Sequence, residues 1–192
     1  MSAKMNFHRW QIAVLLILLS TYSVLFYFIF TYQYKLDFSS FYSAFQLFSN
    51  KQNPYQILYT TYLPTVKRLS ANLNPPIVLW MLTPLLRLSY DLALIIWSAI
   101  SLLLGLIGAH FSFKLAFPPD FMKKNWVSLY LMYLSLFATV MDTAIAQFGS
   151  ILFFFIITGY YCYLKNKENS AGILWGVIIA MKFFPALLFS LP

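Results

Sequence analysis

Asp37 is the first candidate for chemistry, because it follows 25 uncharged residues, 10–34, that predict a membrane-spanning helix. The chain holds only five acidic residues. A carboxylate at the water–lipid boundary is partly desolvated, which raises its proton affinity toward the range that a general base needs. The same aspartate could instead cap a helix, since Asp accepts hydrogen bonds from the free N–H groups of a first turn. Both roles stay open, and they are compatible.

Three other polar residues could bind a sugar or a phosphate. Asp142 and Gln147 occupy a short connection between two apolar segments, where they either satisfy backbone groups at a turn or hydrogen-bond to a ligand. Lys182 lies inside an apolar segment, shortly before Pro185. Its ammonium group either reaches the membrane surface along its aliphatic stem or provides a cation for a lipid-linked phosphate.

The composition indicates an integral membrane protein. Of the 192 residues, 61% are hydrophobic and 9% are charged, whereas a soluble domain is usually about 25% charged. The mean hydropathy is +0.72. The net charge of +8 comes from 13 cations that are scattered between apolar runs without a basic stripe. We therefore expect these cations to set topology and contact membrane lipids, and we expect no nucleic-acid partner.

The motifs give no support to metal or nucleotide chemistry. Cys162 is the single cysteine, and His8 and His110 have no ligand partner at helical spacing, so we expect no metal site. The sequence contains no Walker loop, zincin motif, nucleophile elbow or dinucleotide fingerprint. We accordingly expect no cofactor.

Six apolar segments must position the candidate residues, and they predict an all-α integral membrane protein with a single transmembrane domain over residues 1–192. The segments are 11–31, 75–86, 92–113, 126–141, 148–164 and 171–191. A span needs about 20 apolar residues, so segment 75–86 is too short to cross without help. Small residues predict close helix contacts at Gly105 and Gly108, and at Gly172 with Gly176.

The connection over residues 35–74 is more than a linker. Apolar residues recur at three-to-four spacing over 37–49, which predicts an amphipathic helix along the membrane surface. After a turn at Asn53-Pro54-Tyr55, a second helix is expected over 55–69, broken or kinked at Pro64. Segment 75–86 starts at its two prolines, and Asp91 is expected to cap segment 92–113.

The cations leave the orientation in the membrane open. If the N-terminus is inside and 75–86 does not cross, seven cations face the cytoplasm and five face outside, which the positive-inside rule permits. If 75–86 crosses and the N-terminus is outside, nine face the cytoplasm, which charge alone would prefer. In the first arrangement Asp37, Asn74, the 142–150 loop and Lys182 gather toward the outer face. Ionisable groups at membrane depth are usually functional.

Short motifs are spread along nearly the whole chain. They are Asp37 with Phe41-Tyr42-Ser43-Ala44, Asn53-Pro54-Tyr55, Asn74-Pro75-Pro76, Leu82-Thr83-Pro84-Leu85, Gln147-Phe148-Gly149-Ser150 and Lys182-Phe183-Phe184-Pro185-Ala186-Leu187-Leu188. In this order and spacing the chain resembles glycosyltransferase family 87, the polyprenyl-phosphate-mannose-dependent α-mannosyltransferases with the GT-C fold. The resemblance implies a GT-C-like polytopic helix bundle with juxtamembrane helices in the first outer loop.

The resemblance also implies an enzyme and a site. Asp37, just after the first span, would deprotonate an acceptor hydroxyl as it attacks the anomeric carbon of the donor. The expected substrate-binding residues are Tyr42, Asn74, Asp142, Gln147 and Lys182, with Lys182 facing the donor phosphate on grounds of charge. The expected partners are a polyprenyl-phosphate-sugar donor and a lipid or glycan acceptor. The N-terminus would be cytoplasmic, in a multi-pass protein of a bacterial cell (inner) membrane.

Other functions stay open at this point. A transporter or lipid-flippase fragment would also gather polar residues and broken helices near the membrane, although it would more often carry mid-depth charges in several spans. A non-catalytic membrane scaffold or a truncated product is the third possibility. Because the chain ends at Leu191-Pro192 without a flanking charge and family members are longer, we expect the N-terminal part of a larger protein, which could be inactive alone.

Overall fold

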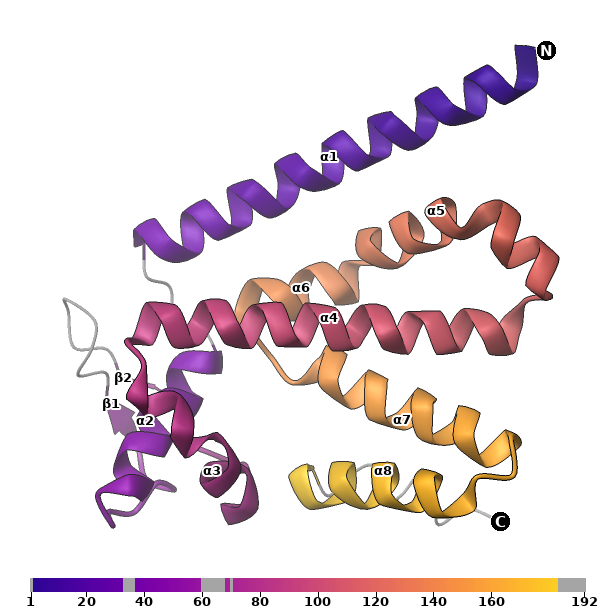
Figure 1. The fold of residues 1–192 in the computed structure, drawn as a ribbon. Helices are drawn as coiled ribbons and strands as arrows, with labels where there is room; N and C mark the ends of the chain where they lie inside the picture. Colours follow the sequence, from indigo (N-terminus) through magenta and orange to yellow (C-terminus); the bar gives the residue numbers. More distant parts are fainter. Residues whose placement is uncertain (1, 33–36, 60–67, 70, 183–192) are drawn as a thin grey trace.

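The computed structural model describes residues 2–32, 37–59, 68, 69 and 71–182, and this part of the chain is almost entirely helical (Figure 1). The elements are α1 (Ser2–Tyr32), α2 (Asp37–Ser49), β1 (Leu58–Tyr59), β2 (Arg68–Leu69), α3 (Pro76–Leu82), η1 (Thr83–Arg87), α4 (Tyr90–Ala116), α5 (Pro119–Ser135), α6 (Phe137–Ile145), α7 (Gly149–Leu164) and α8 (Glu168–Met181). The predicted all-helical class is confirmed, with one small two-stranded exception.

Two helices are long and apolar enough to cross a membrane. They are α1 over Arg9–Phe28 and α4 over Tyr90–Ala116, and a third span is possible if α5 and α6 are one bent unit. Helix α1 exposes most of its apolar side chains, among them Ile17 at 65%. Lipid tolerates an apolar surface of this kind and water does not. The architecture is that of a polytopic helical membrane protein.

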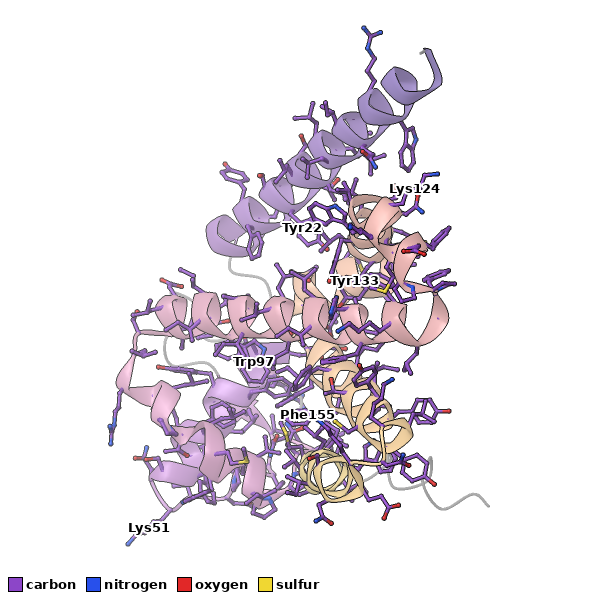
Figure 2. All side chains as sticks on the ribbon, turned by 45° about the vertical axis from the view of Figure 1, so that its right-hand side comes forward. Tyr22, Lys51, Trp97, Lys124, Tyr133 and Phe155 are labelled. Atoms are coloured by element: carbon purple, nitrogen blue, oxygen red, sulfur yellow. The ribbon has the colours of Figure 1, made fainter. Side chains whose placement is uncertain are left out.

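Helix α1 lies along the outside of the bundle and is attached mainly through α5 and α6 (Figures 1 and 2). Gln11 Nε2 donates to Ser128 Oγ at 3.0 Å, and the Tyr22 hydroxyl donates to the Leu134 carbonyl at 3.1 Å. These polar links fix the position of a helix that otherwise buries little of its surface.

The apolar segment 126–141 does not form one straight helix. Helix α5 ends at Ser135, Leu136 has an extended backbone (φ −60°, ψ 130°), and α6 begins at Phe137. The two axes differ by 56°. The sequence offers no proline or glycine here. Helix α5 packs on α1 and α4, whereas α6 also contacts α7, so packing against different neighbours accompanies the bend.

The first loop contains a helix where one was expected, because α2 covers residues 37–49. The second expected helix, over 55–69, is wrong for the residues that the structure describes. Leu58 and Tyr59 pair antiparallel with Leu69 and Arg68 as β1 and β2. Leu58 and Leu69 are both buried in a cluster with Phe45. Burial of this leucine pair outweighs local helix preference. The expected break at Pro64 lies outside the described residues.

Segment 75–86 is short, as expected. It forms the seven-residue helix α3 with Pro76 in its first turn, followed by the five-residue 3₁₀ helix η1. The expected cap of the next helix is corrected. Ser89, not Asp91, is the N-cap of α4, and its hydroxyl accepts from the Leu92 N–H at 3.4 Å. Asp91 lies in the first turn, where its charge still complements the helix dipole.

A cluster rich in aromatic residues joins α2, α3, α4, α7 and α8. Its buried members include Phe38, Tyr42, Val78, Trp97, Phe148 and Ile178. Figure 2 shows Trp97 and Phe155 in the interior, while Lys51 and Lys124 point outward at different ends of the molecule. Phe38 is 0% exposed, and its ring centroid lies 5.7 Å from that of Trp97. The cluster fixes α2 onto the bundle.

The small residues divide into two groups. A side chain at Gly105 would meet Tyr133 and Ser150, and one at Gly108 would come within 3.0 Å of the Phe154 backbone. Close helix packing at these two glycines is therefore confirmed. At Gly172 and Gly176 nothing lies within 4 Å, so close packing there is wrong within the described part of this chain.

Replacing Phe38 by alanine should lower the free energy of unfolding by about 3–5 kcal/mol, because it removes a fully buried ring and leaves a cavity. Thermal unfolding of the detergent-solubilised protein measures this. Phe137→Ala is the matched control, since that ring is 77% exposed and should change stability by less than about 1 kcal/mol. Equal losses in the two variants would contradict the central position of Phe38.

Candidate functional site

Four of the six expected site residues line one cavity of about 420 Å³. They are Asp37 at the start of α2, Asn74 before α3, Gln147 between α6 and α7, and Lys182 after α8. Ser40, Phe41, Ala71, Asn72, Leu73, Phe148, Gly149 and Leu152 complete the lining. The volume lies within the range of small-molecule sites. Residues from distant parts of the sequence thus share one concave surface.

Asp37 is held by Gln147. It is the first residue of α2, is partly buried, and its Oδ2 accepts a short hydrogen bond from Gln147 Nε2. The other oxygen, Oδ1, has no hydrogen-bond partner among the described residues. The amide therefore fixes the orientation of the carboxylate and leaves lone pairs available for a proton.

A tight turn at the end of α6 positions the Gln147 side chain so that it reaches Asp37. Ala146 ends α6 in the left-handed conformation (φ 52°, ψ 52°), and the Gln147 N–H donates to the Asp142 carbonyl at 3.0 Å. The Trp97 indole of α4 donates to the Ala146 carbonyl at 3.0 Å. A non-glycine residue in this conformation is strained unless its surroundings hold it. Here Trp97 provides that support from another helix.

Asp142 caps the next helix rather than facing the cavity. Its Oδ1 accepts from the Gly149 N–H at 2.8 Å, and its Oδ2 accepts from the Ser150 N–H at 2.8 Å and the Ser150 hydroxyl at 2.6 Å. The residue is only 8% exposed. A carboxylate at a helix N-terminus satisfies free N–H groups and complements the dipole. Asp142 therefore fixes the angle between α6 and α7.

Lys182 directly follows the last turn of α8, where its N–H donates to the Ile178 carbonyl at 2.8 Å. Its ammonium nitrogen lies 5.7 Å from the centroid of the Phe148 ring, a cation–π contact. It is partly buried and close enough to Asp37 for the two charges to attract each other. No ion pair joins them in the described part of the chain. The cavity therefore holds one cation and one anion that can each meet a ligand. Residues 183–188 of the motif lie outside the described residues.

Asn72 and Asn74 form a buried polar turn at the cavity wall. Asn72 Oδ1 accepts from Asn74 Nδ2 at 2.8 Å and from the Asn74 N–H at 3.2 Å, and Asn72 Nδ2 donates to the Asn74 carbonyl at 3.1 Å. Asn74 is 2% exposed, and its Oδ1 has no hydrogen-bond partner among the described residues. A buried acceptor without a partner is costly. A substrate hydroxyl would relieve that cost if it could reach this oxygen.

Tyr42 is not part of the cavity lining. The residue is 5% exposed, its ring packs edge-to-face on Tyr90 at 5.4 Å, and its hydroxyl donates to the Leu88 carbonyl at 2.9 Å. Burial raises the pKa of the Tyr42 hydroxyl above its ordinary value, so the group stays a donor. Its position is that of a core residue linking α2 to the start of α4.

Sequence reasoning missed Trp97 and Asn72 as site-forming residues. Trp97 lies within the apolar helix α4, and nothing in the sequence indicates that its indole reaches a turn 49 residues away. Asn72 had a usable signal, since an Asn two residues before another polar residue often forms a side-chain turn. Among the described residues no three His, Cys, Asp or Glu side chains form a group that could hold a metal ion.

Comparison with known proteins gives one family match. The sequence model of glycosyltransferase family 87 matches residues 72–191, well over half of the chain. Asn74, Asp142, Gln147 and Lys182 lie inside the matched range, and Asp37 precedes it. No curated protein and no solved structure gives a significant match.

Replacing Gly149 by alanine should destabilise the turn, because the new Cβ would collide with the Asp142 carboxylate, whose Cγ would be only 2.9 Å away. We expect a loss of about 1–3 kcal/mol in unfolding free energy, the cost of unsatisfied capping groups. Thermal unfolding in detergent measures it. Gly176→Ala is the matched control, because no described residue lies within 4 Å of the position its Cβ would take and alanine favours a helix by about 0.5–1 kcal/mol. A neutral Gly149→Ala would contradict the importance of this cap.

Proposed function

This chain belongs to glycosyltransferase family 87, and from that premise we propose that it moves a hexose, with mannose expected, from a polyprenyl-phosphate donor to a lipid or glycan acceptor. Family membership makes it a membrane glycosyltransferase, an enzyme that uses a sugar donor and an acceptor. The donor class, the sugar, the reaction at the extracytoplasmic face and the cytoplasmic N-terminus belong to the proposal. So does its location in a bacterial cell membrane.

The observation that carries the proposal is the shared cavity of Asp37, Asn74, Gln147 and Lys182. A carboxylate can take a proton, a lysine can meet a phosphate, and amides can hydrogen-bond to sugar hydroxyls. Transfer from a sugar phosphate needs these three abilities together. The cavity supports that combination of groups around one ligand.

In the proposed reaction Asp37 is the general base. Its Oδ1 takes the proton of the acceptor hydroxyl while that oxygen forms a bond to the anomeric carbon of the donor. The bond between the anomeric carbon and the phosphate oxygen breaks, and its electron pair leaves with the polyprenyl phosphate. Gln147 keeps the carboxylate oriented through Oδ2, which supports Oδ1 as the reacting oxygen. No nucleotide takes part.

Lys182 is proposed to bind the donor phosphate. Negative charge grows on the phosphate as the bond to the sugar breaks, and a fixed cation stabilises that charge. The contact with the Phe148 ring restricts where the ammonium group can lie. Because Lys182 forms no ion pair in the described part of the chain, its charge is available to a ligand. Phe148, Leu152 and Leu73 give apolar walls beside it for the start of a prenyl chain.

A transporter or flippase is less well supported. Such a protein needs a path between both sides of the membrane, whereas Asp37, Asn74, Gln147 and Lys182 line a single cavity. Family membership also favours the transferase. A transporter would move its lipid or solute without making a glycosidic bond, so the assays below distinguish the two.

Asp37→Asn should lower sugar transfer by roughly 100- to 10,000-fold, because the amide keeps the shape but cannot accept the proton. The measurement is transfer of radiolabelled mannose from polyprenyl-phosphate-mannose in membranes that contain the protein. Asp91→Asn is the control, since Asp91 is an exposed carboxylate outside the cavity and should leave the rate unchanged. Equal transfer by wild type and Asp37→Asn would remove Asp37 from the mechanism. Absence of transfer by the wild type would reject the proposed donor.

Lys182→Gln should lower kcat/KM for the donor by roughly 10- to 100-fold, the usual effect of losing a hydrogen bond to a charged group. The KM for the acceptor should change little. Lys167→Gln removes an exposed cation at the other end of α8 and is the matched control. If the acceptor KM rises and the donor KM stays constant, the phosphate assignment is wrong.

A further inference from the structure

A second candidate site lies at the opposite end of α4 from Asp37. Helix α4 has 27 residues, so about 40 Å separates its two ends. Figure 1 shows that the C-terminal ends of α4 and α7 and the start of α5 lie on the same side of the molecule, away from α2 and α3. The described part of this end includes Lys114 and Lys165, neither of which takes part in the proposed transfer.

Two lysines are held over one aromatic ring. The ammonium nitrogens of Lys114 and Lys165 lie 5.9 and 5.8 Å from the centroid of Tyr161, and Lys114 is also 5.7 Å from Phe111. The rings of Phe111 and Tyr161 pack at 4.8 Å. The two ammonium groups therefore share the Tyr161 ring as a cation–π partner.

Carboxylates of the chain do not neutralise this pair. Asp120 in the first turn of α5 and Glu168 in the first turn of α8 are the nearest acidic residues in the sequence. Both are exposed, and neither forms an ion pair with Lys114 or Lys165 in the part of the chain that the structure describes. The positive charge is therefore open to an external anion.

The lysines border a cavity of about 530 Å³ whose other walls are mostly apolar. Its lining consists of Lys114, Leu115, Phe117, Pro119, Met122, Tyr161, Leu164 and Lys165. A free anion would use the two cations but not the apolar walls. A molecule with a charged head and an apolar body would use both.

We propose that this pocket binds the phosphate headgroup of an anionic phospholipid. Lys114 and Lys165 hold the phosphate through charge-assisted hydrogen bonds, and an acyl chain lies along Leu115, Phe117 and Leu164. The pocket is at the end of a candidate span, where headgroups are found. The site is independent of the proposed transfer, because it shares no residue with the Asp37 cavity.

The two lysines could instead act only on their helix ends, since both follow or close a C-terminal turn and cations there stabilise a helix. That role needs no ligand. It predicts a lower melting temperature for the lysine variants in lipid-free detergent. Lipid binding predicts that the lipid-free melting temperature stays constant and that the lipid-dependent increase disappears.

The test titrates the purified full chain in detergent with dioleoyl phosphatidylglycerol and counts bound lipid by native mass spectrometry. Lys114→Gln with Lys165→Gln should weaken binding roughly 10- to 30-fold, since each cation near an anionic headgroup contributes about a fivefold factor. Lys123→Gln with Lys124→Gln removes the same charge from neighbouring α5 without touching the pocket, and should change binding by less than about threefold.

Several outcomes would overturn the proposal. Equal weakening in both double variants would mean general attraction between a basic surface and anionic lipid. Equal binding of dioleoyl phosphatidylcholine would remove the role of net lipid charge. Competition by inorganic phosphate at the same concentration as the lipid would indicate a free-anion site. A lower lipid-free melting temperature with unchanged lipid binding would leave the helix-end role alone.

Discussion

Capping of α7 by Asp142 is the constraint on which the candidate site depends. Its carboxylate satisfies the N–H groups of Gly149 and Ser150, and its carbonyl accepts from Gln147. The chain therefore reverses direction at one defined place between α6 and α7. Trp97 holds the strained residue Ala146 from the side. Without these links the Gln147 amide would have no fixed relation to Asp37, because the two residues are 110 positions apart in the sequence.

The cavity keeps opposite charges near each other without pairing them. Asp37 is bonded to an amide, and Lys182 lies over the Phe148 ring, so neither needs the other as its hydrogen-bond partner. Charges that are fixed before a substrate arrives need little reorganisation during a reaction, which is a main source of enzymatic rate enhancement. The arrangement suits a sugar phosphate, which brings one group for a base and another for a cation.

Membrane geometry explains why polar chemistry is confined to the helix ends. The buried residues of α4 are apolar or small, and they include Trp97, Phe113 and Gly105. Groups that need water or charged ligands therefore gather near its two ends, with Asp37 and Lys182 at one and Lys114 and Lys165 at the other. At the first end, α2 and the seven-residue helix α3 pack against α4 through the aromatic-rich cluster.

Composition and periodicity determined the membrane class, the helix over 37–49 and the shortness of segment 75–86. Residue type and position made Asp37, Gln147 and Lys182 candidates, and the family resemblance added Asn74. These features follow from local preference and from the solvent that each segment requires. Tertiary structure decided the pairing of Leu58 with Leu69, the bend at Leu136, the cap at Ser89, the burial of Tyr42 and the capping role of Asp142. Each depends on which neighbour is packed against a residue, and hydrophobic pattern records only that a residue is buried, not what it is buried against.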